Sequence, residues 1–154
     1  MTVELVGSAA HAPHSRTFAE LYAQAQQFYA RQLPILDAHD TERWAAAFTA
    51  DALLELPFLP GPLPVRDALA RYVRAGAAAR RRAGERLTHW VGLLDVQPRP
   101  DGTLHTRCSA LVHATPGPAG RGALSVCVMQ DVLVCAPDGV WRAAHRRVVR
   151  DDLA

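Results

Sequence analysis

Lysine is absent from this chain of 154 residues, and all seventeen of its basic residues are arginines. Without a lysine amine, the protein cannot use Schiff-base chemistry on a carbonyl substrate. Cysteine is scarce: Cys108, Cys127 and Cys135 are odd in number and contain no C-x-x-C pair. They predict neither a disulfide framework nor a zinc site, so we expect buried small hydrophobic side chains, with a reactive thiol as the alternative.

Long hydrophobic runs are missing as well. No apolar stretch reaches the roughly 18 residues of a membrane span, and no basic segment followed by an apolar one opens the chain. We therefore expect a cytoplasmic protein that does not bind membranes. Fifteen acidic residues against seventeen basic ones give a net charge of +2, which is too balanced for the whole surface to bind nucleic acid.

The length of the chain fits one domain, and an apolar content of 49% is enough for a packed core. Residues 1–15 mix Gly, Ser, Ala, Pro and His without periodicity, which predicts a flexible N-terminal arm. Metal binding by His11 and His14 in that arm is the alternative to two solvated histidines. Residues 16–154 are expected to form the single domain.

The first half of the chain predicts helices. Apolar residues recur at intervals of three and four from Thr17 to about Asp37, which indicates an amphipathic helix. Pro34 is expected to kink this helix or to start a new turn, because proline removes a backbone donor. Asp40 is placed to cap a second helix that runs through Trp44 and Phe48.

A short strand is expected over residues 51–57, followed by a proline-rich loop over 58–64 and a third helix over Val65–Arg82 that Gly84 ends. Four β-type runs follow, with turn-forming residues between them: 87–96, 104–114, 123–136 and 140–149. This order predicts an α+β fold in which helices cover one face of a curved antiparallel or mixed sheet. The apolar hollow of such a cone is the default ligand site.

Histidine is the first candidate for chemistry, because its ordinary pKa lies near neutral pH. His89, His105 and His113 lie in the predicted strands, and the last two share a face if no bulge intervenes. Asp37 ends an apolar helix stripe, where an ionised carboxylate is costly unless it is paired. A half-buried structural histidine and a solvated helix-end carboxylate are the alternative interpretations.

The stretch from Leu36 to Ala52 resembles the opening signature of the nuclear transport factor 2-like superfamily and is most similar to its SnoaL-like branch, which includes polyketide cyclases and small lyases. Further parts of the pattern follow in order: Gly61, a helix at Val65, Thr88–Val91, Asp138–Arg142, Arg146 and Asp151. The resemblance implies a cone-shaped α+β barrel. We expect a homodimer formed through an exposed sheet face.

Scytalone dehydratase, a member of the superfamily, uses an aspartate at the end of its first helix and a histidine on each of two adjacent strands. Asp37 and His89 match two of these positions, and His113 falls close to the third. The resemblance implies that Asp37 orients His89 as a general base, while His113 acts as general acid or polarises a carbonyl. Such a set can remove a proton α to a carbonyl, with loss of water or ring closure, and needs no cofactor.

Two tyrosines that hold a water in scytalone dehydratase are replaced here by Leu36 and Pro57, which argues against that enzyme's substrate. Gln130 falls near an amide-bearing position of that family, and Arg146 matches the arginine of its final strand. The predicted hollow would be lined by large apolar side chains and would accept an apolar or aromatic substrate: Trp44, Phe48, Phe58, Trp90 and Met129. Core packing is the alternative role for each of them.

The cluster Arg80–Arg82 ends the third predicted helix, where cations are favoured by the helix dipole. Solvation of that helix end is the simplest interpretation, and contact with a carrier protein is the functional one. Asp37, His89 and His113 could also ligate a metal, although no short-spaced metal motif supports this and we predict no metal. The sequence therefore predicts a cofactor-free lyase or cyclase for polyketide-like or aromatic carbonyl compounds, with a non-catalytic carrier or assembly subunit as the alternative.

Overall fold

The computed structural model describes residues 15–116 and 122–151. The arm expected over residues 1–15, with its two histidines, therefore lies outside the described residues except for Ser15. None of the helices in the described ranges is long and apolar enough to cross a membrane.

Helix α1 (Phe18–Asp37) begins at a capping box: the Thr17 hydroxyl accepts from the Glu20 backbone, and the Glu20 carboxylate accepts from the Thr17 backbone. The predicted apolar stripe is its buried face, and Pro34 lies inside the helix without ending it. The helix ends at Asp37, as the periodicity predicts.

The second helix is shorter than predicted. Asp40 does cap α2 (Thr41–Ala45), but the helix stops before Phe48, which opens β1 (Phe48–Glu55). Pairing with the sheet draws Phe48 into a strand instead of the helix. Phe48 lies opposite Ala143, and the Ala143 amide donates to the Ala47 carbonyl at 2.9 Å.

The third predicted helix is one continuous helical segment in three parts. It consists of α3 (Val65–Ala68), a π-helical turn η1 (Leu69–Val73) and α4 (Arg74–Arg82). Gly84 follows with a φ of 66°, in the left-handed region that favours glycine after a helix.

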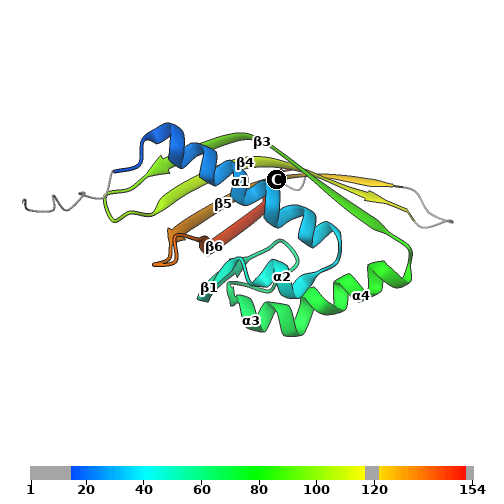
Figure 1. Ribbon diagram of the computed structural model, residues 1–154. Coiled ribbons are helices and arrows are strands. Elements are labelled where there is room, and N and C mark those ends of the chain that lie inside the picture. The colour runs from blue at the N-terminus through cyan, green and yellow to red at the C-terminus, as the bar shows by residue number, and fades with distance from the viewer. Residues whose placement is uncertain (1–14, 117–121, 152–154) are drawn as a thin grey trace, which may run out of the picture.

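The four long β-runs are confirmed as β3 (Arg86–Pro98), β4 (Leu104–Thr115), β5 (Ala123–Cys135) and β6 (Trp141–Arg150). With β1 and the short β2 (Leu63–Pro64) they form one sheet in the order β2-β1-β6-β5-β4-β3. All neighbours are antiparallel except β1 and β6, which are parallel. The sheet is mixed and curved but not closed, and the helices lie against its concave side to complete the cone (Figure 1).

Alternation along the strands separates the two faces of the sheet. On β4 the even-numbered residues from Leu104 to Ala110 are buried beneath α1, whereas the odd-numbered ones point outward. In β3, a bulge between Gly92 and Asp95 adds one residue and so shifts the alternation of that strand by one position. Leu93, within the bulge, has a φ of 52°. The core and the cavity described below therefore share the concave face.

Candidate active site

A cavity of about 650 Å³ lies between the helices and the concave face of the sheet. Its wall is mostly apolar, with contributions from α1, the β1–β2 loop, η1 and the strands, and it includes Leu36, Pro57, Phe58, Tyr72, Val112 and Met129. This volume lies within the range of about 300–1,000 Å³ that is typical of small-molecule sites. The cavity therefore has the size and polarity for a compact apolar ligand.

His89 lines this cavity and is bound by Asp37 through two hydrogen bonds. Asp37 Oδ1 lies 2.5 Å from His89 Nδ1, and Asp37 Oδ2 accepts from the His89 backbone N–H at 3.0 Å. Both side chains are largely buried, at 18% and 14% exposure. A carboxylate at a helix C-terminus lies at the unfavourable end of the dipole, and these two donors compensate for that.

The pair fixes one geometry of the imidazole ring. Because Nδ1 is engaged with the carboxylate, it carries the hydrogen, and Nε2 is left as the basic nitrogen. The predicted contact between Asp37 and His89 is thus present, with the ring at the wall of the cavity.

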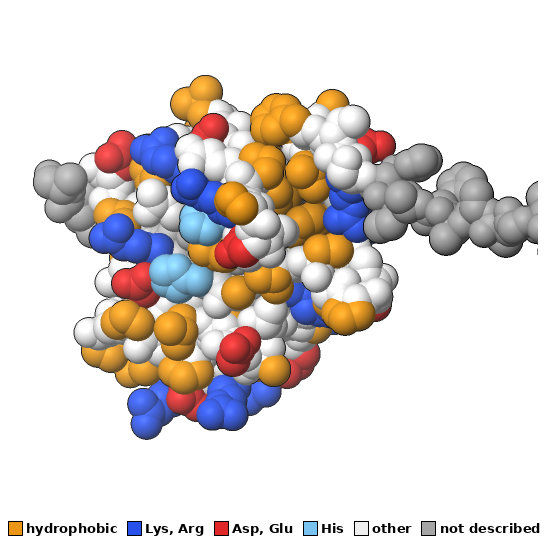
Figure 2. All heavy atoms as spheres, turned by 90° about the vertical axis from the view of Figure 1, so that its left-hand side faces the viewer, with side chains coloured by type: hydrophobic (Ala, Val, Ile, Leu, Met, Phe, Trp, Pro, Cys, Tyr) orange, Lys and Arg blue, Asp and Glu red, His pale blue; other side chains and the backbone are white. Residues whose placement is uncertain are grey.

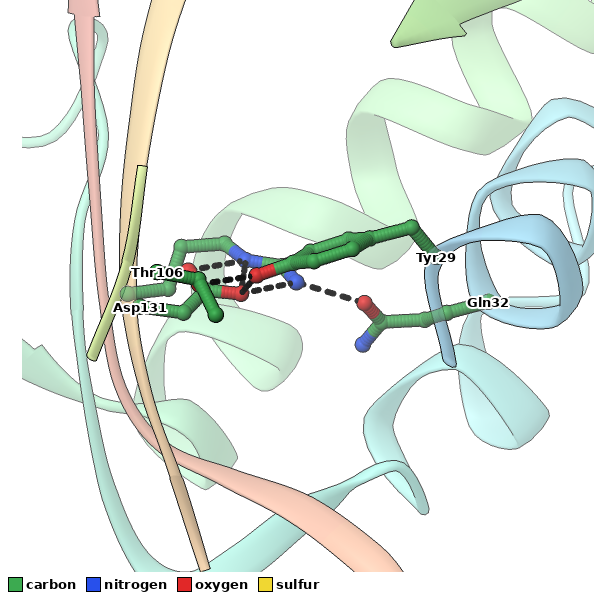
Figure 3. Close-up of polar contacts among 5 residues, drawn as sticks. Tyr29, Gln32, Thr106 and Asp131 are labelled. Atoms are coloured by element: carbon green, nitrogen blue, oxygen red, sulfur yellow. Dashed lines mark hydrogen bonds and ion pairs between the residues drawn. The ribbon is translucent and has the colours of Figure 1, made fainter. Parts of the chain in front are cut away.

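Figure 3 shows a buried polar network that includes Tyr29, Gln32, Thr106 and Asp131. It lies beside the cavity, and its fifth member, Arg146, forms part of the cavity wall. The Arg146 guanidinium donates to Asp131 through Nε and Nη2, at 2.9 and 2.7 Å, and to Gln32 Oε1 at 2.6 Å. The Tyr29 hydroxyl donates to Asp131 Oδ2 at 2.9 Å and lies 2.5 Å from Thr106 Oγ1. These contacts fix the Arg146 side chain in position.

Burial controls the protonation of this network. It raises the pKa of the Tyr29 phenol far above its ordinary value, and the Asp131 carboxylate adds to that shift, so Tyr29 remains a hydrogen-bond donor. Burial alone would lower the pKa of Arg146, but the adjacent Asp131 carboxylate raises it above its ordinary value. Arg146 therefore keeps its positive charge beside Asp131.

Four of the predicted binding residues line the cavity with His89: Trp44, Phe58, Met129 and Arg146. Phe48 does not. It packs in the core beside Trp44, with ring centroids 4.9 Å apart, and lies under the Arg146 guanidinium at 5.1 Å.

His113, Trp90 and Gln130 are on the wrong side of the sheet for the roles predicted for them. His89 pairs with Val112 and both face the cavity, so the next residue, His113, points outward, as does Trp90 with an exposure of 66%. His105 and His113 do share a face, but it is the outer one. The pattern of a strand shows that side chains alternate between the two faces of the sheet, but not which alternate residues face inward. The predicted roles of these three residues were wrong for that reason.

The outer position of His113 also prevents the alternative metal site. Asp37, His89 and His113 do not converge, and no group of three His, Cys, Asp or Glu side chains with ligand geometry occurs within residues 15–116 and 122–151.

Gln130 lies on the outer face in a second, smaller depression of about 330 Å³, with His105, Arg107, His145 and Arg147. Figure 2 shows histidine and arginine side chains gathered at one end of the molecule, next to exposed hydrophobic ones. His145, which lines this depression, has its Nε2 2.7 Å from Glu55 Oε2. The sheet separates the depression from the cavity.

Sequence reasoning missed Tyr29, Gln32, Thr106 and Asp131 as parts of the site. A signal was present, because Gln32 interrupts the apolar stripe of α1 and Asp131 interrupts an apolar strand at an inward position. Buried polar groups require partners, so these two, together with Arg146, predict a shared network.

The sequence matches the SnoaL-like domain family over residues 17–147. No curated relative matches the sequence. The protein Aln2 from a Streptomyces species is 35% identical, with 90% of this chain and 96% of Aln2 covered and a TM-score of 0.73. A protein from Catenulispora acidiphila, solved in complex with S-DNPA, is 29% identical over 88% of this chain and 96% of that one, with a TM-score of 0.73.

An NTF2-like protein from Novosphingobium aromaticivorans shares the fold, at 21% identity over 90% of this chain and 92% of that one, with a TM-score of 0.68. The cone-shaped architecture and the sequence motifs therefore indicate the same fold. The chain belongs to the SnoaL-like domain family.

Proposed function

We propose that the protein is a cofactor-free acid–base enzyme, a lyase or cyclase that acts on a polyketide-like or aromatic carbonyl compound. The observation that carries this proposal is the Asp37–His89 pair at the wall of an apolar cavity of about 650 Å³. The Catenulispora acidiphila relative, solved with a small molecule, supports ligand binding in this family.

The reaction begins at His89. With Nδ1 held by Asp37, Nε2 removes a proton from the carbon α to the substrate carbonyl, and the electron pair moves onto the carbonyl oxygen. Asp37 stabilises the imidazolium that forms, in the way a carboxylate orients a catalytic histidine. Trp44, Phe58 and Met129 provide apolar surface for a flat substrate.

The second proton transfer does not use His113, which faces away from the cavity. The imidazolium of His89 itself supplies the proton. In a dehydration, the electron pair returns from the enolate to expel a β-hydroxyl, which takes the proton from Nε2 and leaves as water. In a ring closure, the enolate carbon attacks a second carbonyl and the new alkoxide takes that proton.

The proposal is tested by proton exchange at the carbon next to a ketone. With 2-tetralone in D2O as the probe, deuterium incorporation followed by NMR should exceed that produced by an equal concentration of imidazole. Asp37→Asn should reduce this rate on the order of 100-fold, because the orienting carboxylate is lost. Asp40→Asn is the matched control, since the Asp40 carboxylate caps α2 by accepting from the Arg43 backbone.

A non-catalytic carrier gives a different result. It would bind the ketone without accelerating exchange, and Asp37→Asn would then equal the wild type. Either observation overturns the assignment of His89 as a base and favours the carrier function.

We also propose that two copies associate through the outer face of the sheet. Trp90 and Leu111 lie directly opposite each other on β3 and β4, with Leu124 on β5 beside them, and all three are exposed. Burial of such a patch against a second copy would remove its apolar surface from water.

Contact with a carrier protein through Arg80–Arg82 is a further part of the proposal. Arg80 is held by Glu85 at 3.3 Å, and Arg81 donates to the His39 carbonyl at 3.2 Å, while Arg82 is exposed. An acidic surface of the carrier protein would be attracted to the arginines at this helix end. Reversing the charge with Arg82→Glu would then weaken the association.

A further inference from the structure

The smaller depression on the outer face of the sheet is lined by five side chains that carry a positive charge or can accept one. These are Arg99, His105, Arg107, His145 and Arg147. The proposed reaction uses none of them, because they lie on the opposite side of the sheet from the cavity. The volume of the depression, about 330 Å³, is sufficient for a small polar ligand.

Arg107 and Arg147 lie in the same row across the sheet. Arg107 on β4 lies opposite Gln130 on β5, and Gln130 lies opposite Arg147 on β6. Since neighbouring strands are about 4.8 Å apart, the Cα atoms of the two arginines are separated by about 10 Å. All three residues are exposed, so the short glutamine side chain lies between two long arginine side chains on one face.

Two histidines lie in the next row. His105 precedes Arg107 by two residues on β4, and His145 precedes Arg147 by two residues on β6, with Val132 opposite both histidines. A separation of two residues keeps a side chain on the same face and moves it about 7 Å along the strand. The two arginines and two histidines therefore surround an area of about 10 by 7 Å.

The acidic residues near Arg107 are engaged by other side chains. Asp95 lies opposite Arg107 on β3, but its Oδ2 accepts from Gln97 Nε2 at 2.8 Å. The Asp131 carboxylate has a side-chain exposure of 0% and is held by Arg146 on the inner face of the sheet. Neither carboxylate forms an ion pair with Arg107.

Arg147 is in the same situation. Glu55 lies opposite it on β1, but Glu55 Oε2 lies 2.7 Å from His145 Nε2. Within the part of the chain that the structure describes, the guanidinium groups of Arg107 and Arg147 have no ion pair and no hydrogen bond. Two like charges at this spacing repel each other, and an anion bound between them would remove that repulsion.

We propose that this depression binds a phosphate group, which Arg107 and Arg147 hold from its two sides. A phosphate monoester carries roughly 1.5–2 negative charges at neutral pH and has three acceptor oxygens, so it can bind both arginines at once. The planar guanidinium suits phosphate because it donates two parallel hydrogen bonds. The ligand is an organic phosphate monoester or inorganic phosphate, and the site does not depend on the proposed reaction.

Calorimetry at constant, low ionic strength tests the proposal, since salt weakens interactions between exposed charges. The probes are glycerol 3-phosphate and inorganic phosphate, with acetate and glycerol as controls. The wild type should bind at least one phosphate probe with a Kd about tenfold lower than that for acetate or less, and should not bind glycerol. Arg107→Gln and Arg147→Gln should each raise this Kd about five- to tenfold.

The two phosphate probes distinguish the sources of the ligand. A lower Kd for glycerol 3-phosphate than for inorganic phosphate would assign the site to organic phosphate monoesters. A Kd for inorganic phosphate that is equal or lower would assign it to the free anion.

Arg31→Gln is the matched control, because Arg31 is an exposed arginine of α1 that does not line the depression. It should bind phosphate as the wild type does. An equal loss of affinity in Arg31→Gln and Arg107→Gln would show a general effect of net charge and overturn the proposal. Equal affinities for phosphate and acetate would overturn it too, as would unchanged phosphate binding in the Arg107→Gln/Arg147→Gln double variant.

Two further measurements separate this site from the other proposals. Deuterium exchange on 2-tetralone should be unchanged in Arg107→Gln, so the phosphate site and the assignment of His89 can fail independently. The apolar patch proposed for association lies on the same face, with Leu111 about 13 Å along β4 from Arg107. Phosphate binding that appeared only in the Trp90→Glu/Leu111→Glu variant would mean that association covers the depression, and it would overturn the proposal for the wild-type protein.

Discussion

The guanidinium of Arg146 and the carboxylate of Asp131 are almost fully buried, at 3% and 0% side-chain exposure. Such a pair contributes little net stability compared with apolar residues, whereas removal of one partner costs about 3–5 kcal/mol. Here Gln32 accepts from Arg146, Tyr29 donates to Asp131, and Thr106 contacts the Tyr29 hydroxyl. The network therefore fixes the position of Arg146 at the cavity wall more than it stabilises the fold.

Tyr29 makes this network sensitive to alkaline pH. Its pKa in the folded protein lies far above the ordinary value of about 10, because of burial and the Asp131 charge. Above pH 10 the unfolded chain loses the phenolic proton and the folded protein keeps it, so stability falls as pH rises, by up to about 1.4 kcal/mol per pH unit from this group. Below pH 10 the group contributes no pH dependence.

Urea unfolding between pH 8 and 11 measures the effect. Tyr29→Phe should have a lower free energy of unfolding at pH 8. Above pH 10 its free energy of unfolding should fall less steeply with pH, because about one proton fewer is released on unfolding. Parallel declines in the two proteins would contradict the assignment of a shifted pKa to Tyr29.

At the scale of elements, the bulge of β3 lets Val96 beyond it share the inner face of the sheet with His89 before it. Leu93 is 84% exposed and has a φ of 52°, a conformation that costs a non-glycine residue about 1–2 kcal/mol. Leu93→Gly should raise the free energy of unfolding by up to about 1 kcal/mol, since glycine avoids the Cβ contact but has more unfolded-state entropy.

Leu53→Gly is the matched control, because Leu53 is an exposed strand leucine outside the left-handed region. It should lower the free energy of unfolding by about 0.5–1 kcal/mol. If both variants were destabilised equally, the backbone of Leu93 would not be strained.

The elements themselves could largely be predicted from the sequence. Periodicity identified α1, the third helical segment and β3–β6 because each has a long, regular pattern. Pairing between distant segments could not be predicted in the same way: Phe48 leaves the second helix because Ala143 lies opposite it. The same limit applies to the site. Asp37 and His89 could be identified from their positions in the sequence, whereas the side of the sheet on which His113 lies depends on the register of the strands.

At the scale of the whole molecule, the outer face of the sheet is the surface that distinguishes a monomer from a dimer. Light scattering coupled to size exclusion should give twice the chain mass of 16.7 kDa. Trp90→Glu with Leu111→Glu should convert the protein to monomers, because each charge would be buried at the interface without a partner.

Val140→Glu is the control for this experiment, since Val140 is 49% exposed but lies in the β5–β6 turn. It should leave the dimer intact. A wild-type protein that elutes with the mass of a single chain at micromolar concentration would refute the association.

The Asp37 carboxylate joins the end of α1 to the β3 backbone through one oxygen and orients the ring of His89 through the other. Local fraying of the last turn of α1 would therefore detach the helix and misalign the imidazole in one event. The proposed function then predicts that thermal loss of activity begins below the melting temperature, because partial opening at this one junction is enough to misplace the proposed base. Improved thermotolerance would then be sought by stabilising this junction before the rest of the molecule.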